Sequence, residues 1–110
     1  MKSDKDLQLQ LIVCKAICNF AYNNQKNFSK DEMLIKKLVS FTDPAYPNSD
    51  IKNASLFTLK NILYKASREI KEAIMKELTY ERLIQLFDDQ SLDCQKQTLM
   101  LLRNLLFDKS

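Results

Sequence analysis

The sequence has no glycine and no histidine, and its only prolines are Pro44 and Pro47. Glycine is the usual residue for left-handed turns, β-bulges and helix ends, so its absence argues against sheets and hairpins. It also removes the glycine-rich loops in which backbone amides approach a phosphate closely. The composition therefore predicts an all-α protein and disfavours nucleotide binding by a P-loop or a dinucleotide fold.

The absence of histidine removes Ser-His and Cys-His nucleophile pairs together with the commonest metal ligand. Cys14, Cys18 and Cys94 make an odd count without metal-ligand spacing, which is typical of small core residues in a reducing compartment. Adjacent acids such as Asp88 and Asp89 usually solvate a turn and are weak evidence for acid–base catalysis. We therefore expect no enzyme activity, no cofactor and no metal, and a cytoplasmic or nuclear location.

Neither the charge nor the hydropathy of the chain is extreme. The 17 basic and 14 acidic residues give a net charge of +3, which is too mild to indicate nucleic acid unless basic residues cluster. The largest basic excess, from Lys60 to Lys76, is interrupted by Glu69 and Glu72 and is typical of a solvated helical face. No apolar run approaches the length of a membrane span and the start is charged, so we expect neither a span nor a signal peptide.

An internal repeat is the most informative feature of the chain. Three segments align on an asparagine: LIVCKAICNFAY (11–22), NASLFTLKNILY (53–64) and KQTLMLLRNLLF (96–107). Asn19 and Asn61 are 42 residues apart, and Asn61 and Asn104 are 43 apart. These separations lie within the roughly 40–47-residue period of HEAT and armadillo arrays.

Each of the three segments carries an apolar stripe at helical spacing, which predicts a long helix with one face to bury. The residues of the stripe are Cys14, Ile17, Phe20 and Ala21, then Leu56, Leu59, Ile62 and Leu63, then Leu99, Leu102, Leu105 and Leu106. Because no single unit can bury its stripe alone, we expect neighbouring units to stack into one core.

Shorter helices are predicted between the long ones. Ser29 and Glu32 form a capping-box pattern that indicates a helix through Phe41. Residues 43–49 contain both prolines and predict a loop, after which Ser49 or Asp50 is expected to cap the second long helix.

The last unit is predicted to contain a helix from Arg68 to Glu77 and, after a cap at Thr79, a helix from Tyr80 to Phe87. Leu83, Ile84 and Phe87 are expected to face inward, and a turn at residues 88–91 leads into the last helix. This order of helix, helix and long helix fits a three-helix armadillo repeat better than a two-helix HEAT repeat. The chain is thus predicted to be one unit of about two and a half repeats, with boundaries at 1–24, 25–67 and 68–110.

Neither end of this array has a polar cap. We expect partial exposure of Leu7, Leu9, Leu11 and Ile12 at one end and of Leu105, Leu106 and Phe107 at the other. Such ends would be covered by the neighbouring repeats of a longer protein or by self-association.

The segments Leu59-Lys60-Asn61-Ile62 and Leu102-Arg103-Asn104-Leu105 resemble the long helices of the armadillo-repeat family, which includes β-catenin and importin-α. The resemblance implies an armadillo-type α-solenoid, a right-handed superhelix. Residues 53–107 are most similar to the armadillo scaffold subunit of the GID/CTLH E3 ubiquitin ligase complex, whereas the earlier residues match less distinctly. That subunit is non-catalytic and holds a substrate receptor against the ligase core in the cytoplasm and nucleus, for proteasomal degradation. The resemblance implies a docking surface for other protein subunits and no active site.

In such an array the long helices line a concave groove. The candidate partner-binding residues on it are Lys15, Asn19, Tyr22, Phe57, Lys60, Asn61, Tyr64, Met100, Arg103 and Asn104. Two roles remain open for the asparagines, since their amides can pair with a bound peptide or bond the neighbouring repeat and hold the stack. The aromatic residues are likewise open to packing or partner contact.

The groove residues also suggest which partners it favours. Lys15, Phe57 and Met100 stand where importin-α has the tryptophans that bind nuclear signals, so that activity is disfavoured. Lys60 and Arg103 favour an acidic partner. The main prediction is therefore a protein–protein interaction scaffold. The alternative is a helical-repeat module that binds RNA, which requires lysines concentrated on the groove and a steep loss of binding with salt.

Overall fold

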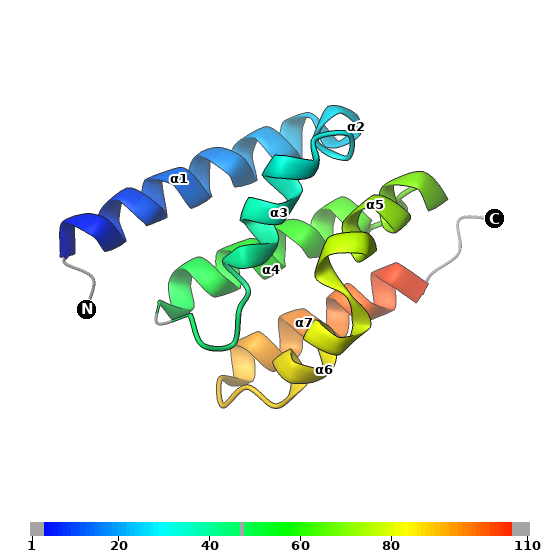
Figure 1. Cartoon of the computed structure of the whole chain (residues 1–110). Helices are drawn as coiled ribbons and strands as arrows, with labels where there is room; N and C mark the ends of the chain where they lie inside the picture. The colour runs from blue at the N-terminus through cyan, green and yellow to red at the C-terminus, as the bar shows by residue number, and fades with distance from the viewer. Residues whose placement is uncertain (1–3, 47, 107–110) are drawn as a thin grey trace.

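The computed structural model describes residues 4–46 and 48–106, and its regular structure is entirely helical over those residues (Figure 1). The all-α prediction is therefore confirmed. The helices are α1 (Asp4–Asn23), α2 (Gln25–Phe28), α3 (Glu32–Ser40), α4 (Ser49–Leu63), α5 (Arg68–Leu78), α6 (Tyr80–Phe87) and α7 (Leu92–Leu106).

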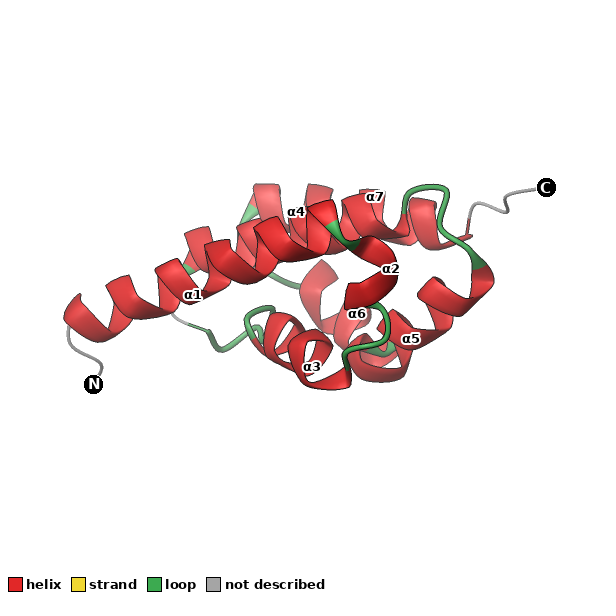
Figure 2. Cartoon of the chain, turned by 90° about the horizontal axis from the view of Figure 1, so that it is seen from above, coloured by secondary structure: helices red, strands yellow, loops and turns green. Residues whose placement is uncertain are grey.

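The helices form two layers, which Figure 2 shows one above the other. The long helices α1, α4 and α7 make one layer, in which α4 lies between α1 and α7. The shorter helices α3, α5 and α6 make the second layer. The three segments that align on an asparagine are thus the three long helices, and they run in the same direction (Figure 1).

The core lies between the layers and is centred on α4. Leu56, Leu59, Ile62 and Leu63 are all fully buried there, because α4 has a neighbour on each side and the second layer beneath it. Fully burying one such side chain contributes about 1.5–3 kcal/mol relative to leaving it exposed. The predicted stripe is therefore correct in full for this helix.

The same stripe is only partly buried on the outer helices. Leu99 and Leu106 of α7 are 60% and 68% exposed, and Phe20 of α1 is 40% exposed. The physical reason is that α1 and α7 each have a long helix on one side only, whereas α4 has one on both. The burial of a side chain at a given repeat position thus depends on which helices lie beside its own helix as well as on its place in the repeat.

The two ends of the layer expose apolar side chains, as predicted for Leu9, Ile12 and Leu106. Leu7 and Leu11 are half-buried, as expected for partial exposure. Leu105 is an exception because it points into the core and is buried. Phe107 lies outside the described residues.

Two predicted helix caps are wrong by one or a few residues. The side chain of Asp31 caps α3 by accepting from the Leu34 amide at 3.1 Å, whereas the Ser29 hydroxyl donates to the Lys26 carbonyl at the end of α2. Ser29 therefore belongs to the C-terminal end of α2, a short helix that the sequence pattern did not predict. Asn48 caps α4 by accepting from the Ile51 amide at 3.1 Å, in place of Ser49 or Asp50.

The predicted helix over residues 80–87 and its cap at Thr79 are confirmed, since the Thr79 hydroxyl accepts from the Arg82 amide. The predicted inward face is partly wrong. Leu83 and Leu86 are buried, Phe87 is half-buried, and Ile84 is 65% exposed. Leu83 and Leu86 are three residues apart and share one face of this short helix, so Ile84 falls outside it.

Left-handed backbone occurs even though glycine is absent. Lys65, just after α4, has φ of 53°, and Thr79, between α5 and α6, has φ of 67°. A positive φ of this kind costs a residue other than glycine about 1–3 kcal/mol, which the rest of the fold offsets. The lack of glycine therefore predicts the helical class but does not exclude sharp turns.

The two halves of the chain are tied by polar contacts as well as by the core. The ammonium of Lys52 on α4 lies 2.6 Å from a carboxylate oxygen of Asp89, in the turn before α7, and both side chains are nearly buried. The guanidinium of Arg82 on α6 donates to the Thr42 hydroxyl at 3.3 Å. The first contact joins α4 to the turn before α7, and the second joins α6 to the loop after α3 within the second layer.

Candidate partner-binding groove

A hollow of about 340 Å³ lies between α1 and α4 on the long-helix layer. Its lining consists of Lys15, Cys18, Asn19, Tyr22, Ala54, Phe57, Thr58 and Asn61. The lining residues of each helix have the spacing i, i+3, i+4 and i+7, so each set follows one helical face. The structure thus brings together five of the ten predicted residues: Lys15, Asn19, Tyr22, Phe57 and Asn61. We call this hollow the α1–α4 groove.

Several aromatic side chains on this face are exposed to solvent. Tyr22 is 62% exposed and Phe57 is 50% exposed, both in the lining of the groove. Tyr64, which directly follows the end of α4, is also exposed, at 54%. Aromatic residues of this kind are the usual anchors of protein interfaces, because they offer a large rigid contact area.

The sequence did not predict the surroundings of Lys60 at this surface. The residue as a whole is only 8% exposed, and its ammonium lies 4.2 Å from the centroid of the Phe57 ring. The aliphatic stem is therefore packed while the charge rests on an aromatic face, a cation–π contact. Phe57 and Lys60 act as one amphipathic unit at the edge of the groove.

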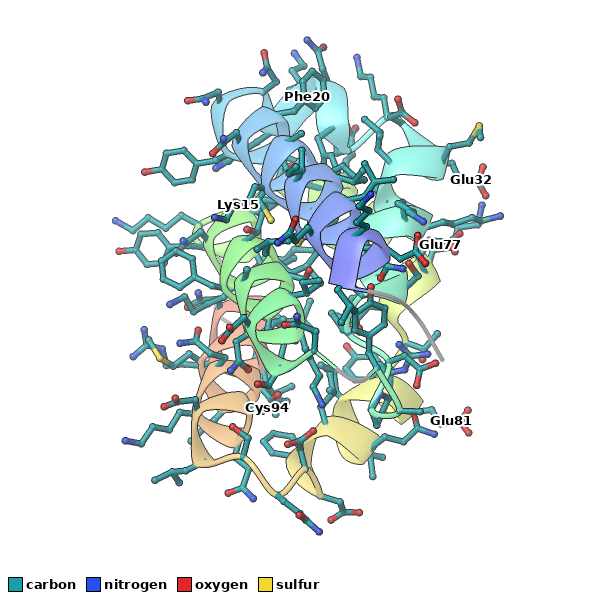
Figure 3. All side chains as sticks on the ribbon, turned by 90° about the vertical axis from the view of Figure 1, so that its left-hand side faces the viewer. Lys15, Phe20, Glu32, Glu77, Glu81 and Cys94 are labelled. Atoms are coloured by element: carbon teal, nitrogen blue, oxygen red, sulfur yellow. The ribbon has the colours of Figure 1, made fainter. Side chains whose placement is uncertain are left out.

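Two further cations of the long-helix layer, Lys15 and Arg103, are exposed. Lys15 lines the groove, and Arg103 lies on α7. In Figure 3 Lys15 points to the opposite side of the molecule from Glu32, Glu77 and Glu81, which belong to the second layer. No acidic side chain is among the residues that line the groove. Its local charge is therefore positive.

The three asparagines of the repeat have different surroundings. Asn104 is 6% exposed, and its side-chain amide donates to the Lys60 carbonyl at 3.0 Å, so it joins α7 to α4. Asn19 is exposed and Asn61 half-buried, and both line the α1–α4 groove. Asn104 thus joins neighbouring helices in the stack, whereas Asn19 and Asn61 lie at the open surface.

Met100 and Arg103, the remaining predicted residues, are exposed on α7 and lie outside the lining of the groove. Cys18, Ala54 and Thr58 line it although the sequence analysis did not select them. Cys18 could have been found from the repeat, because it stands directly before Asn19 just as Lys60 stands directly before Asn61. Small side chains carry no obvious binding chemistry, which is why such positions are overlooked.

Cys14 and Cys18 lie one turn apart on α1, where Cys18 lines the groove and Cys14 is fully buried. Their sulfur atoms are 3.9 Å apart, and the Cys14 sulfur is 3.3 Å from the Ser55 hydroxyl of α4. The pKa of Cys14 is lowered to about 7, chiefly by the hydrogen bond from Cys18 and less by Ser55 and Lys15, against the opposing effect of burial. The same hydrogen bond and burial raise the pKa of Cys18.

A second hollow, of about 450 Å³, lies between the loop after α3 and helix α6. It is lined by Asp43, Pro44, Ala45, Arg82, Gln85 and Asp88, none of which was predicted as a site residue. Arg82 is already engaged there, since its guanidinium donates to the Val39 carbonyl and the Thr42 hydroxyl. We therefore assign this hollow a structural role.

Within residues 4–46 and 48–106, no group of three or more histidine, cysteine or acidic side chains is arranged to hold a metal ion. None of the described helices combines the length and apolar character that crossing a bilayer requires. No family model, curated protein or solved structure gives a significant match to this chain.

Proposed function

We propose that this chain is a non-catalytic protein-binding scaffold of the armadillo type, which holds an extended segment of a partner protein along α1, α4 and α7. The repeat of 42 and 43 residues between the asparagines supports the armadillo assignment. The order of α5, α6 and α7, two short helices before a long one, agrees with a three-helix repeat.

The observation that carries the proposal is the composition of the α1–α4 groove. Tyr22 and Phe57 expose aromatic area, Asn19 and Asn61 offer amide donors and acceptors, and Lys15 adds a charge. An extended peptide presents a donor and an acceptor at almost every residue, which such amides can pair at about 1 kcal/mol net per hydrogen bond. Binding would then be the sum of several such bonds and one or two aromatic anchors.

The charge of the groove favours an acidic segment. Lys15 lines the groove, Arg103 is an exposed cation of α7 outside its lining, and the ammonium of Lys60 is positioned over Phe57. Carboxylates of the partner would make charge-assisted hydrogen bonds to these groups, which are about twice as strong as neutral ones. A segment that combines acidic and apolar residues fits this surface best.

The resemblance of residues 53–107 to the scaffold subunit of the GID/CTLH ubiquitin ligase supports a more specific assignment. The partners would then be a substrate receptor and the ligase core, in the cytoplasm or nucleus. The open apolar faces of α1 and α7, which include Ile12 and Leu99, would be covered by neighbouring repeats or by a second copy.

Affinity purification with mass spectrometry tests this function in the protein that carries the chain. The groove variant combines Phe57→Ala with Asn61→Ala, because both side chains line the groove without being fully buried. Lys60→Glu is unsuitable, since it would place a carboxylate at a nearly buried position. The matched control is Ile84→Ala, an exposed apolar side chain of the second layer.

We expect ligase subunits to co-purify with the unaltered protein and with the Ile84→Ala control, and at least one of them to be lost from the groove variant. Thermal unfolding should be nearly the same for all three proteins. Absence of ligase subunits would reject the ligase assignment. If RNA were recovered in their place, with binding that falls steeply as salt rises, the nucleic-acid alternative would replace the scaffold.

A further inference from the structure

The outer long helices α1 and α7 each have an exposed apolar edge. Leu99 and Leu106 are exposed on α7, and Leu9 and Phe20 are exposed on α1. Because α4 lies between these two helices, the edges are on opposite sides of the long-helix layer (Figure 1). The internal repeat indicates what each edge can hold, because the equivalent positions of α4 are already covered.

The apolar edge of α7 repeats the side of α4 that already holds a helix. Leu99 occupies the repeat position of Leu56, 43 residues earlier. Leu106 occupies that of Leu63 in the same way, and both α4 leucines are fully buried. They lie one turn before and one turn after Lys60, whose carbonyl accepts a hydrogen bond from α7. The α7 edge therefore has the form of the surface on which α7 itself is seated.

The apolar edge of α1 repeats the opposite side of α4, which packs on the preceding long helix. Leu9 occupies the repeat position of Ile51, 42 residues later, and Phe20 occupies that of Ile62. Both isoleucines are fully buried, and the Cys14 thiol of α1 donates to the Ile51 carbonyl at 3.8 Å. Ile62 lies about three turns further along the same face of α4.

The chain thus carries both halves of one interface. On α7, Cys94 and Leu105 hold the positions of Leu9 and Phe20, and they are buried where α7 packs against α4. A second copy that seats its α1 on the α7 edge of the first would continue the α4–α7 interface by one step. Contact between two α7 edges or two α1 edges would not reproduce this pairing.

We propose that copies of this chain associate head to tail, with α1 of one copy packed against α7 of the next. The long helices run in the same direction, so the added α1 is parallel to α7 as α7 is to α4 (Figure 1). Asn19, which is exposed, then stands beside Arg103 of the other copy as Asn104 stands beside Lys60. The Arg103 carbonyl is in the last turn of α7, where carbonyls have no partner in their own helix.

This association uses the edges of the long-helix layer and does not require a partner in the α1–α4 groove. It also leaves a free edge on each end of a pair of copies. A head-to-tail contact of this kind adds further copies unless it closes into a ring. We therefore expect a monomer at low protein concentration and species larger than a dimer as the concentration rises.

Sedimentation velocity of the purified chain over a range of concentrations tests the proposal. Leu9→Lys and Leu99→Lys each place a charge on one edge, at a position that is 60% exposed in the monomer. Each variant alone should need a concentration about tenfold higher or more to associate, because the charge would be desolvated in the contact. Ile84→Lys is the matched control on the second layer and should associate like the unaltered chain.

A mixture of the two edge variants is the deciding measurement. Leu9→Lys keeps its α7 edge and Leu99→Lys keeps its α1 edge, so an equimolar mixture should form a dimer and nothing larger. Circular dichroism shows that each variant is folded, and Ile12→Lys with Leu106→Lys is a second pair at exposed positions. A mixture that stays monomeric, or a dimer formed by one edge variant alone, would overturn the proposal. An unaltered chain that remains a monomer at every concentration would overturn it as well.

Discussion

The side-chain amide of Asn104 donates a hydrogen bond to the backbone carbonyl of Lys60, 3.0 Å away. That carbonyl is in the last turn of α4, where carbonyls have no partner within their own helix unless the turn tightens. The amide of Tyr64, four residues further on, bonds to Asn61 instead. Asn104 therefore satisfies an end carbonyl of α4 and fixes the register of α7 against it.

This bond predicts that Asn104→Ala is destabilising. Removing the amide leaves a buried carbonyl unpaired, so we expect the free energy of unfolding to fall by about 1–3 kcal/mol. Asn19→Ala is the matched control at the equivalent repeat position, and because Asn19 is exposed it should change stability by less than about 0.5 kcal/mol. Urea denaturation measures both. Equal losses would mean that the two asparagines have the same role.

Leu56 and Leu99 occupy the same position of the repeat but are 0% and 60% exposed. Leu56→Ala should cost about 2–5 kcal/mol, because it opens a cavity in the core. Leu99→Ala should cost less than about 0.5 kcal/mol in the isolated chain. Urea denaturation measures the free energy of unfolding of both variants. A large loss of stability for Leu99→Ala would show that a second copy already covers α7.

The buried ion pair of Lys52 and Asp89 predicts a pH dependence. The hydrogen bond from Lys52, and then the amide of Ser91, hold the pKa of Asp89 below its ordinary value. Since the folded pKa is the lower one, the stabilisation is fully present above the unfolded-state pKa of about 4. It is lost as the pH falls through the folded value.

We therefore expect Asp89→Asn to reduce stability by about 3–5 kcal/mol at neutral pH, because Lys52 is left buried and unpaired. The variant should also lose less stability than the unaltered chain as the pH is lowered below about 4. Lys36→Met is the control, since the Lys36–Glu32 pair is exposed and should contribute only about 0–1 kcal/mol. Denaturation at a series of pH values checks both parts. Parallel acid curves for Asp89→Asn and the unaltered chain would contradict the assignment.

Lys65 adopts a left-handed conformation just after α4. Lys65→Gly should raise stability by up to about 1 kcal/mol, because glycine adopts this conformation without the steric cost. Glu72→Gly, at an exposed position inside α5, should instead lower stability by about 1 kcal/mol. Thermal unfolding of the two variants should therefore shift in opposite directions.

Periodicity and capping chemistry were enough to predict the helical class, the three long helices and the helix over 80–87. They were not enough for the cap of α3, where Asp31 and Ser29 are both good capping residues and only the presence of α2 decides between them. The predicted inward face of α6 was partly wrong, because an eight-residue helix has too few turns to define one stripe.

The candidate site was predictable to the extent that the repeat aligns equivalent positions. That alignment brought Lys15, Asn19 and Asn61 to one groove. It could not distinguish Asn104, because burial at an equivalent position depends on which neighbours are present. Nor could it predict that the ammonium of Lys60 would lie over Phe57, since a side-chain contact of this kind depends on three-dimensional packing.

The central claim is that a partner protein lies along the α1–α4 groove. Site-specific photo-crosslinking tests it most directly, with a photoreactive phenylalanine analogue introduced in turn at Tyr22, Phe57 and Ile84 of the protein in cells. We predict that positions 22 and 57 give adducts with the same partner protein, and that position 84 on the second layer does not. Equal adducts at position 84, or adducts with RNA alone at positions 22 and 57, would contradict the claim.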